Sequence, residues 1–197
     1  MPIAKEQIPN LLTLSRIALI PVLALLLYLP FSLAAWLALF LYIIICLTDY
    51  LDGWLARRMG AVTPLGTFLD PIADKILVAV MLLIFVHIER LPGFWILPVM
   101  IILTREFLIA GLREYLGAKK VQVPVMWIAK WKTAVQMFAL AFLIIGDVSR
   151  DYLFIGWTLL LAAAAITAYT GYAYIKAAWG HLTGKAGDTV DTPQKTT

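Results

Sequence analysis

The sequence predicts an all-α polytopic membrane protein, a bundle of six transmembrane helices with both termini in the cytoplasm. Hydrophobic residues make up 62% of the 197 residues, and the mean hydropathy is +0.89, whereas soluble domains are roughly 45–50% apolar. Apolar stretches close to the roughly 20 residues that cross a bilayer recur along the chain. Segments rich in turn-forming residues, such as "YLPFS" and "ERLPG", separate these stretches.

Six spans follow from hydropathy and from the length that a helix needs in a bilayer: about 10–29, 33–57, 67–88, 94–116, 126–146 and 152–177. Helices satisfy their own backbone hydrogen bonds in lipid, and the sequence lacks the alternation of a membrane β-barrel. We expect one transmembrane domain over residues 1–180 and a polar, disordered tail over 181–197. The first span lacks a small-residue cleavage site, so no cleavable signal peptide is expected.

The basic residues set the expected orientation. Of the sixteen Lys and Arg residues, all but Arg90 and Arg150 fall on the side that the two termini share or at adjoining helix ends. Such an excess marks the cytoplasmic side. The net charge of +4 therefore reflects topology and attraction to anionic lipid headgroups, and does not indicate nucleic-acid binding. The amphipathic start of the first span places Asn10, Thr13 and Arg16 at the cytoplasmic surface.

The second span ends in an acidic segment, "TDYLDGWLARR". On a helix, Asp52, Gly53 and Ala56 fall within roughly 60° of Asp49, and Arg57 borders this face. Two carboxylates thus share a face with the smallest side chains of the segment. Small residues beside carboxylates leave room for a bulky group to approach the backbone. This pattern indicates a binding site rather than a packing stripe.

The third span carries a second acidic face close to the first. Gly66, Asp70 and Asp74 recur every four residues and line one side of a helix. Pro71 fits either the first turn of a helix capped by Asp70 or a kink just inside a helix that starts near Thr67. The link between the second and third spans is short, so these helices are expected to be antiparallel neighbours with both acidic faces near the cytoplasmic end.

Clustered acids in a membrane need neutralisation, because each aspartate near mid-membrane costs roughly 2.5–3.5 kcal/mol. Arg57, Arg58 and Lys75 do not obviously neutralise the whole set. Carboxylates are hard oxygen ligands for Mg²⁺ or Mn²⁺, and Mg²⁺ usually combines few carboxylates with substrate phosphates. The alternative is that these charges simply end the helices in the headgroup layer. The predicted metal ligands are Asp49, Asp52, Asp70 and Asp74.

Four cations in or at the ends of the fourth and fifth spans form a second group. They are Arg105, Arg113, Lys130 and Lys132. An intramembrane cation is a candidate functional residue, and together these side chains fit a phosphate-binding pocket. The alternatives are internal pairs with Glu106 or Glu114, and snorkelling. Gly111 and Gly171 are expected to mark close contacts between helices.

The acidic segment resembles the signature of the CDP-alcohol phosphotransferase family, D-x2-D-G-x2-A-R-x8-G-x3-D-x3-D. Residues 49–57 and 66–74 match every fixed position with the expected spacing. The flanking segments "IPNLLTLSRI", "TREFLIAGLREYL" and "IAKWKTAVQM" resemble the bacterial branch of the family that makes phosphatidylglycerophosphate.

This resemblance implies a transfer of the phosphatidyl group of CDP-diacylglycerol to glycerol 3-phosphate, with release of CMP and with Mg²⁺ or Mn²⁺ as cofactor. It implies two ions held by the four aspartates, with Asp74 also the general base, and an acceptor phosphate on the four cations. It also implies a homodimer among membrane lipids in the bacterial inner membrane, with its site facing the cytoplasm. The implied contacts to the CDP-lipid are Asn10, Thr13, Arg16, Gly53, Ala56, Arg57, Gly66 and Thr67.

Several alternatives stay open at this point. Another acceptor, such as inositol phosphate, phosphatidylglycerol or serine, is conceivable, although a cationic pocket suits an anionic acceptor better than serine. A membrane prenyltransferase also binds a magnesium diphosphate, but its aspartate motifs are typically far apart in the sequence. A divalent-cation carrier or channel would need carboxylates deep in a pore and would have little use for nearby cations.

Overall fold

The structure is a computed structural model that describes residues 7–59, 63–119, 121 and 127–183. All regular structure in these residues is helical, which confirms that the fold is all-α. Each of the six long helices overlaps one predicted span. The elements are α1 (Gln7–Leu27), α2 (Ser32–Met59), α3 (Pro64–His87), the 3₁₀ turn η1 (Gly93–Trp95), α4 (Ile96–Ala118), α5 (Ile128–Ile144) and α6 (Arg150–Leu182).

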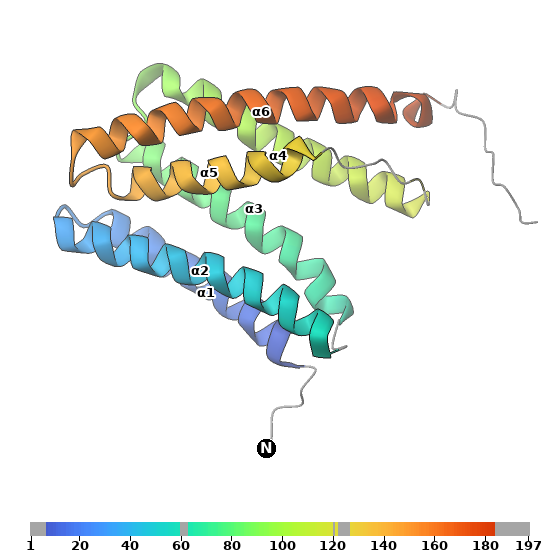
Figure 1. The fold of residues 1–197 in the computed structure, drawn as a ribbon, viewed down its shortest axis with the longest axis horizontal. Coiled ribbons are helices and arrows are strands. Elements are labelled where there is room, and N and C mark those ends of the chain that lie inside the picture. Colours follow the sequence, from blue (N-terminus) through green and yellow to red (C-terminus); the bar gives the residue numbers. More distant parts are fainter. Residues whose placement is uncertain (1–6, 60–62, 120, 122–126, 184–197) are drawn as a thin grey trace, which may run out of the picture.

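The helix α3 lies at the centre of the arrangement (Figure 1). On one side of it α1 packs against α2, and on the other side α6 packs against both α4 and α5. Since α3 contacts α1, α4 and α5, it joins the two groups of helices. Residues on different faces of α3 therefore meet different partners, which matters for the acidic face described below.

The start of α3 resolves the question that Pro71 raised. Thr63 is the N-cap: its backbone is extended and its hydroxyl accepts a hydrogen bond from the Gly66 N–H at 3.0 Å, as a helix N-terminus favours. Pro64 occupies the first turn, where a missing N–H is tolerated. Pro71 consequently lies inside the helix, and Asp70 is not its cap. Lys75 Nζ donates to the carbonyl oxygen of Pro71 at 2.7 Å.

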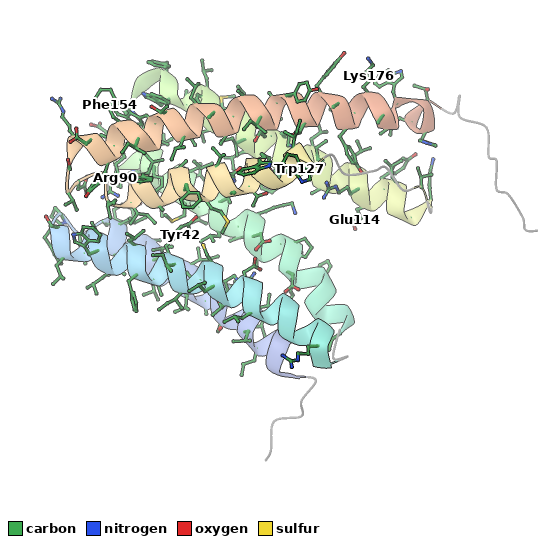
Figure 2. All side chains as sticks on the ribbon, viewed as in Figure 1. Tyr42, Arg90, Glu114, Trp127, Phe154 and Lys176 are labelled. Atoms are coloured by element: carbon green, nitrogen blue, oxygen red, sulfur yellow. The ribbon has the colours of Figure 1, made fainter. Side chains whose placement is uncertain are left out.

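The outer surface of the helices is rich in large apolar side chains, as lipid contact requires. Examples are Leu25, Phe40 and Phe138, which are 68%, 64% and 62% exposed, and Figure 2 shows Phe154 pointing away from the bundle. Three segments are long and apolar enough to cross a membrane, namely Ser32–Asp49, Gly93–Ala118 and Arg150–Leu182, and α1 and α5 provide shorter apolar helices. The described residues thus have the character of a membrane protein.

Arg90 connects helices at the end of the bundle where α3 ends. This side chain is only 5% exposed and forms an ion pair with Asp147. Its Nη1 also donates to the carbonyl oxygens of Leu143 and Ile144, at 2.9 and 2.7 Å. The Trp157 indole in turn donates to the Arg90 carbonyl at 2.8 Å. Arg90 therefore ties the segment after α3 to the turn between α5 and α6.

Candidate functional site

Three of the predicted aspartates contact α1, where this helix packs against α2 and α3. Arg16 Nη1 lies 2.5 Å from Oδ1 of Asp49 on α2 and 3.2 Å from Oδ1 of Asp74 on α3. Thr13, one turn away on α1, donates its hydroxyl hydrogen to Asp70 Oδ1 at 2.8 Å. Residues three apart share a helix face. A single face of α1 therefore binds acids from both neighbouring helices.

Burial differs sharply between the two sides of this cluster. The Arg16 side chain is 0% exposed, whereas the side chains of Asp49 and Asp74 are 38% and 56% exposed. A guanidinium buried in this way needs carboxylate partners, because removing a charge from water is costly. Arg16 and Thr13 thus form the inner wall of the site, and the carboxylates keep an open side toward a ligand.

The residues of this cluster fit a divalent cation. Arg16 Nη1 contacts both Asp49 and Asp74, so these two carboxylates converge on one positive group. Their oxygens are the donors that Mg²⁺ and Mn²⁺ take. Among the described side chains, no three His, Cys, Asp or Glu residues form a metal-binding group. The side chain of Asp52, a predicted ligand, lies outside those that the structure describes.

Gly66, another predicted site residue, is buried at the start of α3, where its N–H bonds to the N-cap. The side chains of several other predicted site residues are not described. Asn10 belongs to α1, the group from Asp52 to Arg57 belongs to α2, and Lys130 belongs to α5, but their side-chain positions are not described. The full set outside the described side chains is Asn10, Asp52, Gly53, Ala56, Arg57, Thr67 and Lys130.

The predicted cations on α4 and α5 come together around Glu106. Lys132, which is 6% exposed, forms an ion pair with this carboxylate, and Arg105 Nη1 lies 3.2 Å from its Oε1. Arg105 Nη2 donates to the hydroxyl of Thr170 on α6 at 3.4 Å. Arg113 lies close enough to repel the charges of Arg105 and Lys132. Two cations thus pair with one carboxylate while a third lies nearby, which leaves a positive excess for an anionic ligand.

Helix α6 packs against Arg105 and Arg113. Contact of α6 with these cations was not predicted from the sequence. A Cβ at Gly171 would lie 2.8 Å from Arg105 Cγ, so the stem of Arg105 crosses α6 at a residue without a side chain. The Arg113 guanidinium lies over the Tyr174 ring, 5.4 Å from its centre. The close contact predicted at Gly171 is therefore present. The one predicted at Gly111 is wrong for the part of the chain that the structure describes, because a Cβ there would meet none of its atoms within 4 Å.

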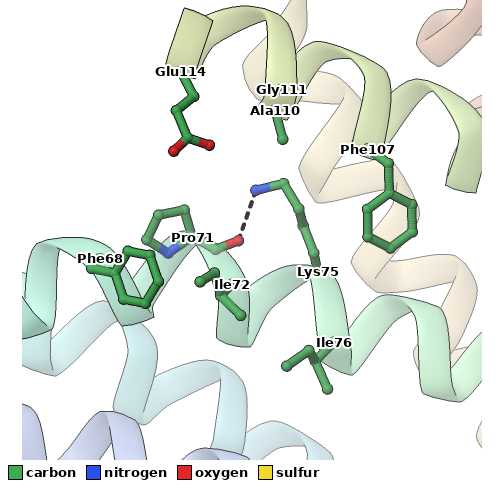
Figure 3. A pocket seen from close by; sticks show the side chains of 9 residues that line it. All are labelled: Phe68, Pro71, Ile72, Lys75, Ile76, Phe107, Ala110, Gly111 and Glu114. Atoms are coloured by element: carbon green, nitrogen blue, oxygen red, sulfur yellow. Dashed lines mark hydrogen bonds between the residues drawn. The ribbon is translucent and has the colours of Figure 1, made fainter. Parts of the chain in front are cut away.

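A pocket of about 520 Å³ lies on another face of α3, between α3 and α4 (Figure 3). Lys75 and Glu114 point toward it, and its other walls are apolar or made of small residues, including Phe68, Ile72 and Phe107. Residue 72 is roughly 200° around the helix from residue 70, so this face is opposite to the one that contacts α1. The pocket is distinct from the acidic cluster, and its mostly apolar lining does not suit a nucleotide.

Comparisons with known proteins find similarity over most of the chain. Residues 6–169 match the family model described as CDP-alcohol phosphatidyltransferase. A protein of Rickettsia bellii (strain RML369-C) named CDP-diacylglycerol–glycerol-3-phosphate 3-phosphatidyltransferase is 42% identical over 175 residues, which are 87% of this chain and 95% of that protein.

Two more distant relatives carry the same name. The protein of Salmonella choleraesuis (strain SC-B67) is 40% identical over 180 residues, covering 89% of this chain and 97% of its own length. The protein of Pseudomonas fluorescens is 38% identical over 181 residues, covering 89% of this chain and 92% of its own length. The similarity therefore extends over nearly the whole of each protein.

Proposed function

The chain belongs to the CDP-alcohol phosphatidyltransferase family, and we propose that it transfers the phosphatidyl group of CDP-diacylglycerol to glycerol 3-phosphate. The products are phosphatidylglycerophosphate and CMP, so the protein acts in phospholipid biosynthesis. The observation that carries this conclusion is the identity of about 40% with proteins named for that reaction, over most of each chain. The positive excess around Glu106 supports the choice of a phosphorylated acceptor.

The reaction joins the terminal hydroxyl oxygen of glycerol 3-phosphate to the phosphorus of the phosphatidyl group. The bond from this phosphorus to the bridging oxygen of the diphosphate breaks, and CMP leaves with that oxygen. Phosphoryl transfer depends more on positioning and charge neutralisation than on covalent chemistry by the protein. The hydroxyl proton goes to the carboxylate of Asp74, which is the general base in this proposal.

The four aspartates Asp49, Asp52, Asp70 and Asp74 hold the divalent ions, Mg²⁺ or Mn²⁺. When bound, such ions neutralise the diphosphate and stabilise the attacking and leaving oxygens of an in-line displacement. The chain's own contribution is to hold the carboxylates in place: Arg16 orients Asp49 and Asp74, and Thr13 orients Asp70. The remaining contacts to the CDP-lipid come from Asn10, Gly53, Ala56, Arg57, Gly66 and Thr67.

The acceptor phosphate binds between α4, α5 and α6. Arg105, Arg113 and Lys132 supply the charge, with Lys130 from the start of α5. Glu106 keeps Arg105 and Lys132 together in the free enzyme and limits the repulsion among the cations. Arginine suits this role because its planar fork matches phosphate oxygens.

All six helices cross the membrane in this proposal, with both termini in the cytoplasm of a bacterium and the acidic cluster at the cytoplasmic face of the inner membrane. The distribution of basic residues supports that orientation. The acyl chains of the CDP-lipid then stay in the bilayer while its nucleotide and the water-soluble acceptor reach the site from the cytoplasm. Homodimerisation belongs to the same proposal.

A single assay tests this function. Detergent-purified protein is incubated with CDP-diacylglycerol, Mg²⁺ and one candidate acceptor at a time, and CMP is measured. We expect release with glycerol 3-phosphate, essentially none with serine, and loss of release when a chelator removes the metal. CMP release that requires inositol phosphate instead would move the enzyme to another branch of the family. A lack of CMP with every alcohol would favour the carrier or channel.

A further inference from the structure

On α4, α5 and α6, three buried polar atoms have no hydrogen-bond partner among the described residues. They are Arg105 Nε on α4, Gln136 Oε1 on α5 and Thr167 Oγ1 on α6. Gln136 is 4% exposed and Thr167 is 0% exposed. Buried polar groups are nearly always bonded, and each exception needs an explanation. The apolar surroundings make an unbonded group still more costly.

Arg105 and Thr167 are linked through Thr170. Arg105 donates to the Thr170 hydroxyl at 3.4 Å. That hydroxyl in turn donates to the carbonyl oxygens of Ile166 and Thr167, at 2.8 and 3.2 Å. Thr167 is thus one helical turn from the residue that Arg105 contacts, in the direction away from the α6 C-terminus.

The packing of α5 against α6 places Gln136 close to Thr167 along the helix axis. A Cβ at Gly156 would lie 3.0 Å from the Leu143 side chain, and one at Gly146 would lie 2.9 Å from Leu153. With this antiparallel register, residue 136 is level with residue 163, about 6 Å along the axis from Thr167. Gln136 also lies one turn beyond Lys132 on the same buried face of α5.

We infer that Gln136 and Thr167 bind the free hydroxyl of glycerol 3-phosphate, one turn beyond the cations that bind its phosphate. The inference rests on the proposed function and extends it to substrate specificity. The terminal hydroxyl of this acceptor attacks, so its middle hydroxyl stays unreacted and needs partners in a buried site. That hydroxyl can donate to Gln136 Oε1 while it exchanges a hydrogen bond with Thr167 Oγ1.

The comparison of two acceptors tests this assignment. 3-Hydroxypropyl phosphate retains the phosphate and the terminal hydroxyl of glycerol 3-phosphate but lacks the middle hydroxyl. We expect the wild-type enzyme to prefer glycerol 3-phosphate by about tenfold or more in kcat/KM, because the acceptor without the middle hydroxyl leaves two buried polar groups unbonded. The wild-type preference needs no variant, and equal kcat/KM values for the two acceptors would overturn the inference.

Two variants then locate the preference. Gln136→Met and Thr167→Val are each expected to lower kcat/KM for glycerol 3-phosphate about tenfold and to leave kcat/KM for 3-hydroxypropyl phosphate unchanged. Thr167→Ser, which keeps the hydroxyl, should restore the preference. Thr158→Val is the matched control, since Thr158 is exposed on the same helix and bonds to its own backbone at Phe154.

Activity with 3-hydroxypropyl phosphate also reports whether a variant is folded. Equal losses with both acceptors in Gln136→Met and Thr167→Val would mean a structural role only and would overturn the inference. A wild-type enzyme that releases no CMP with glycerol 3-phosphate would instead contradict the proposed function, so the two failures give different results.

Discussion

Arg16 and Asp49 form an ion pair of 2.5 Å that joins α1 to α2, with the guanidinium fully buried and the carboxylate 38% exposed. A buried cation on α1, outside the acidic segment, thus partly neutralises the negative charge of the acidic cluster. The carboxylate keeps its outer side free for a second cation. In the function proposed above, this asymmetry would keep the acids stable both without and with a bound metal ion.

Arg16→Met tests whether the ion pairs of Arg16 stabilise the protein. The variant leaves Asp49 and Asp74 without their buried partner, and the free energy of unfolding should fall. A fully buried pair would lose about 3–5 kcal/mol; because these carboxylates are partly exposed, we expect about 1–3 kcal/mol. Thermal unfolding in detergent without metal measures the loss, and Arg150→Met, at an exposed position, serves as the control. An unchanged Tm would contradict the structural role of Arg16.

The same variant should respond more strongly to metal than the wild type. If Mg²⁺ binds the carboxylates that Arg16 neutralises, it replaces part of the missing charge, and binding to the folded state raises stability. Adding Mg²⁺ should therefore narrow the difference in Tm between Arg16→Met and the wild type. An equal shift in both proteins would argue against a shared set of carboxylates.

Asp74→Asn removes the proposed general base and keeps the shape of the side chain. General-base catalysis is worth about 10²–10⁴ in rate, so CMP release should fall by at least about a hundredfold, while the Tm changes little. Asp151→Asn is the matched control, since Asp151 is exposed at the start of α6. Near-normal turnover of Asp74→Asn would assign the base to another group.

The fold was largely predictable because its signals are local. Hydropathy and span length located the six α-helices of the described residues, since burying a backbone in lipid requires a helix. The N-cap at Thr63 lay outside the predicted third span, because its effect depends on the Thr63–Gly66 hydrogen bond rather than on hydropathy. Residues 60–62, in the predicted linker, lie outside the described residues.

The site was predictable where residues share a helix and less so where they meet across helices. Spacing along α3 placed Asp70 and Asp74 on one face of the helix. Both residues contact α1, in agreement with that prediction. Periodicity along one helix gives no information about its neighbours. Arg16 was therefore expected beside the nucleotide and not as the partner of two aspartates.

Arg113→Ala should raise the KM for glycerol 3-phosphate with a smaller effect on the KM for CDP-diacylglycerol. A hydrogen bond to a charged group contributes roughly 1.5–3 kcal/mol, which corresponds to a rise of about tenfold or more. Initial rates at varied concentrations of each substrate measure both constants. Lys119→Ala removes an exposed charge near the end of the same helix and should change neither. Equal increases in both KM values would contradict a role specific to the acceptor.

Arg90→Met should destabilise the protein and leave the chemistry intact. The substitution removes two donors from the carbonyl oxygens of Leu143 and Ile144 and breaks the pair with Asp147. The Leu143 carbonyl keeps the Gly146 N–H as a donor, but hydrogen bonds to a charged donor contribute about 1.5–3 kcal/mol, so a clear fall in Tm is expected. Below the new Tm, the KM values should stay at wild-type levels, because Arg90 lies at the opposite end of α3 from the acids. A changed KM for either substrate would show that the two ends are coupled.

Gly171→Ala tests whether α6 positions the acceptor site. Its Cβ would lie 2.8 Å from Arg105 Cγ, closer than side-chain carbons pack, so Arg105 must move and weaken its bond to Thr170. We expect the KM for glycerol 3-phosphate to rise about three- to tenfold, in line with one weakened hydrogen bond, with the KM for CDP-diacylglycerol unchanged. Gly111→Ala is the matched control: it adds the same methyl group to a membrane helix at a place where a Cβ meets nothing within 4 Å. Both variants should gain slightly in helix propensity, so a difference in KM between them isolates the contact with Arg105. If Gly171→Ala behaved like Gly111→Ala, the position of Arg105 would not depend on this glycine.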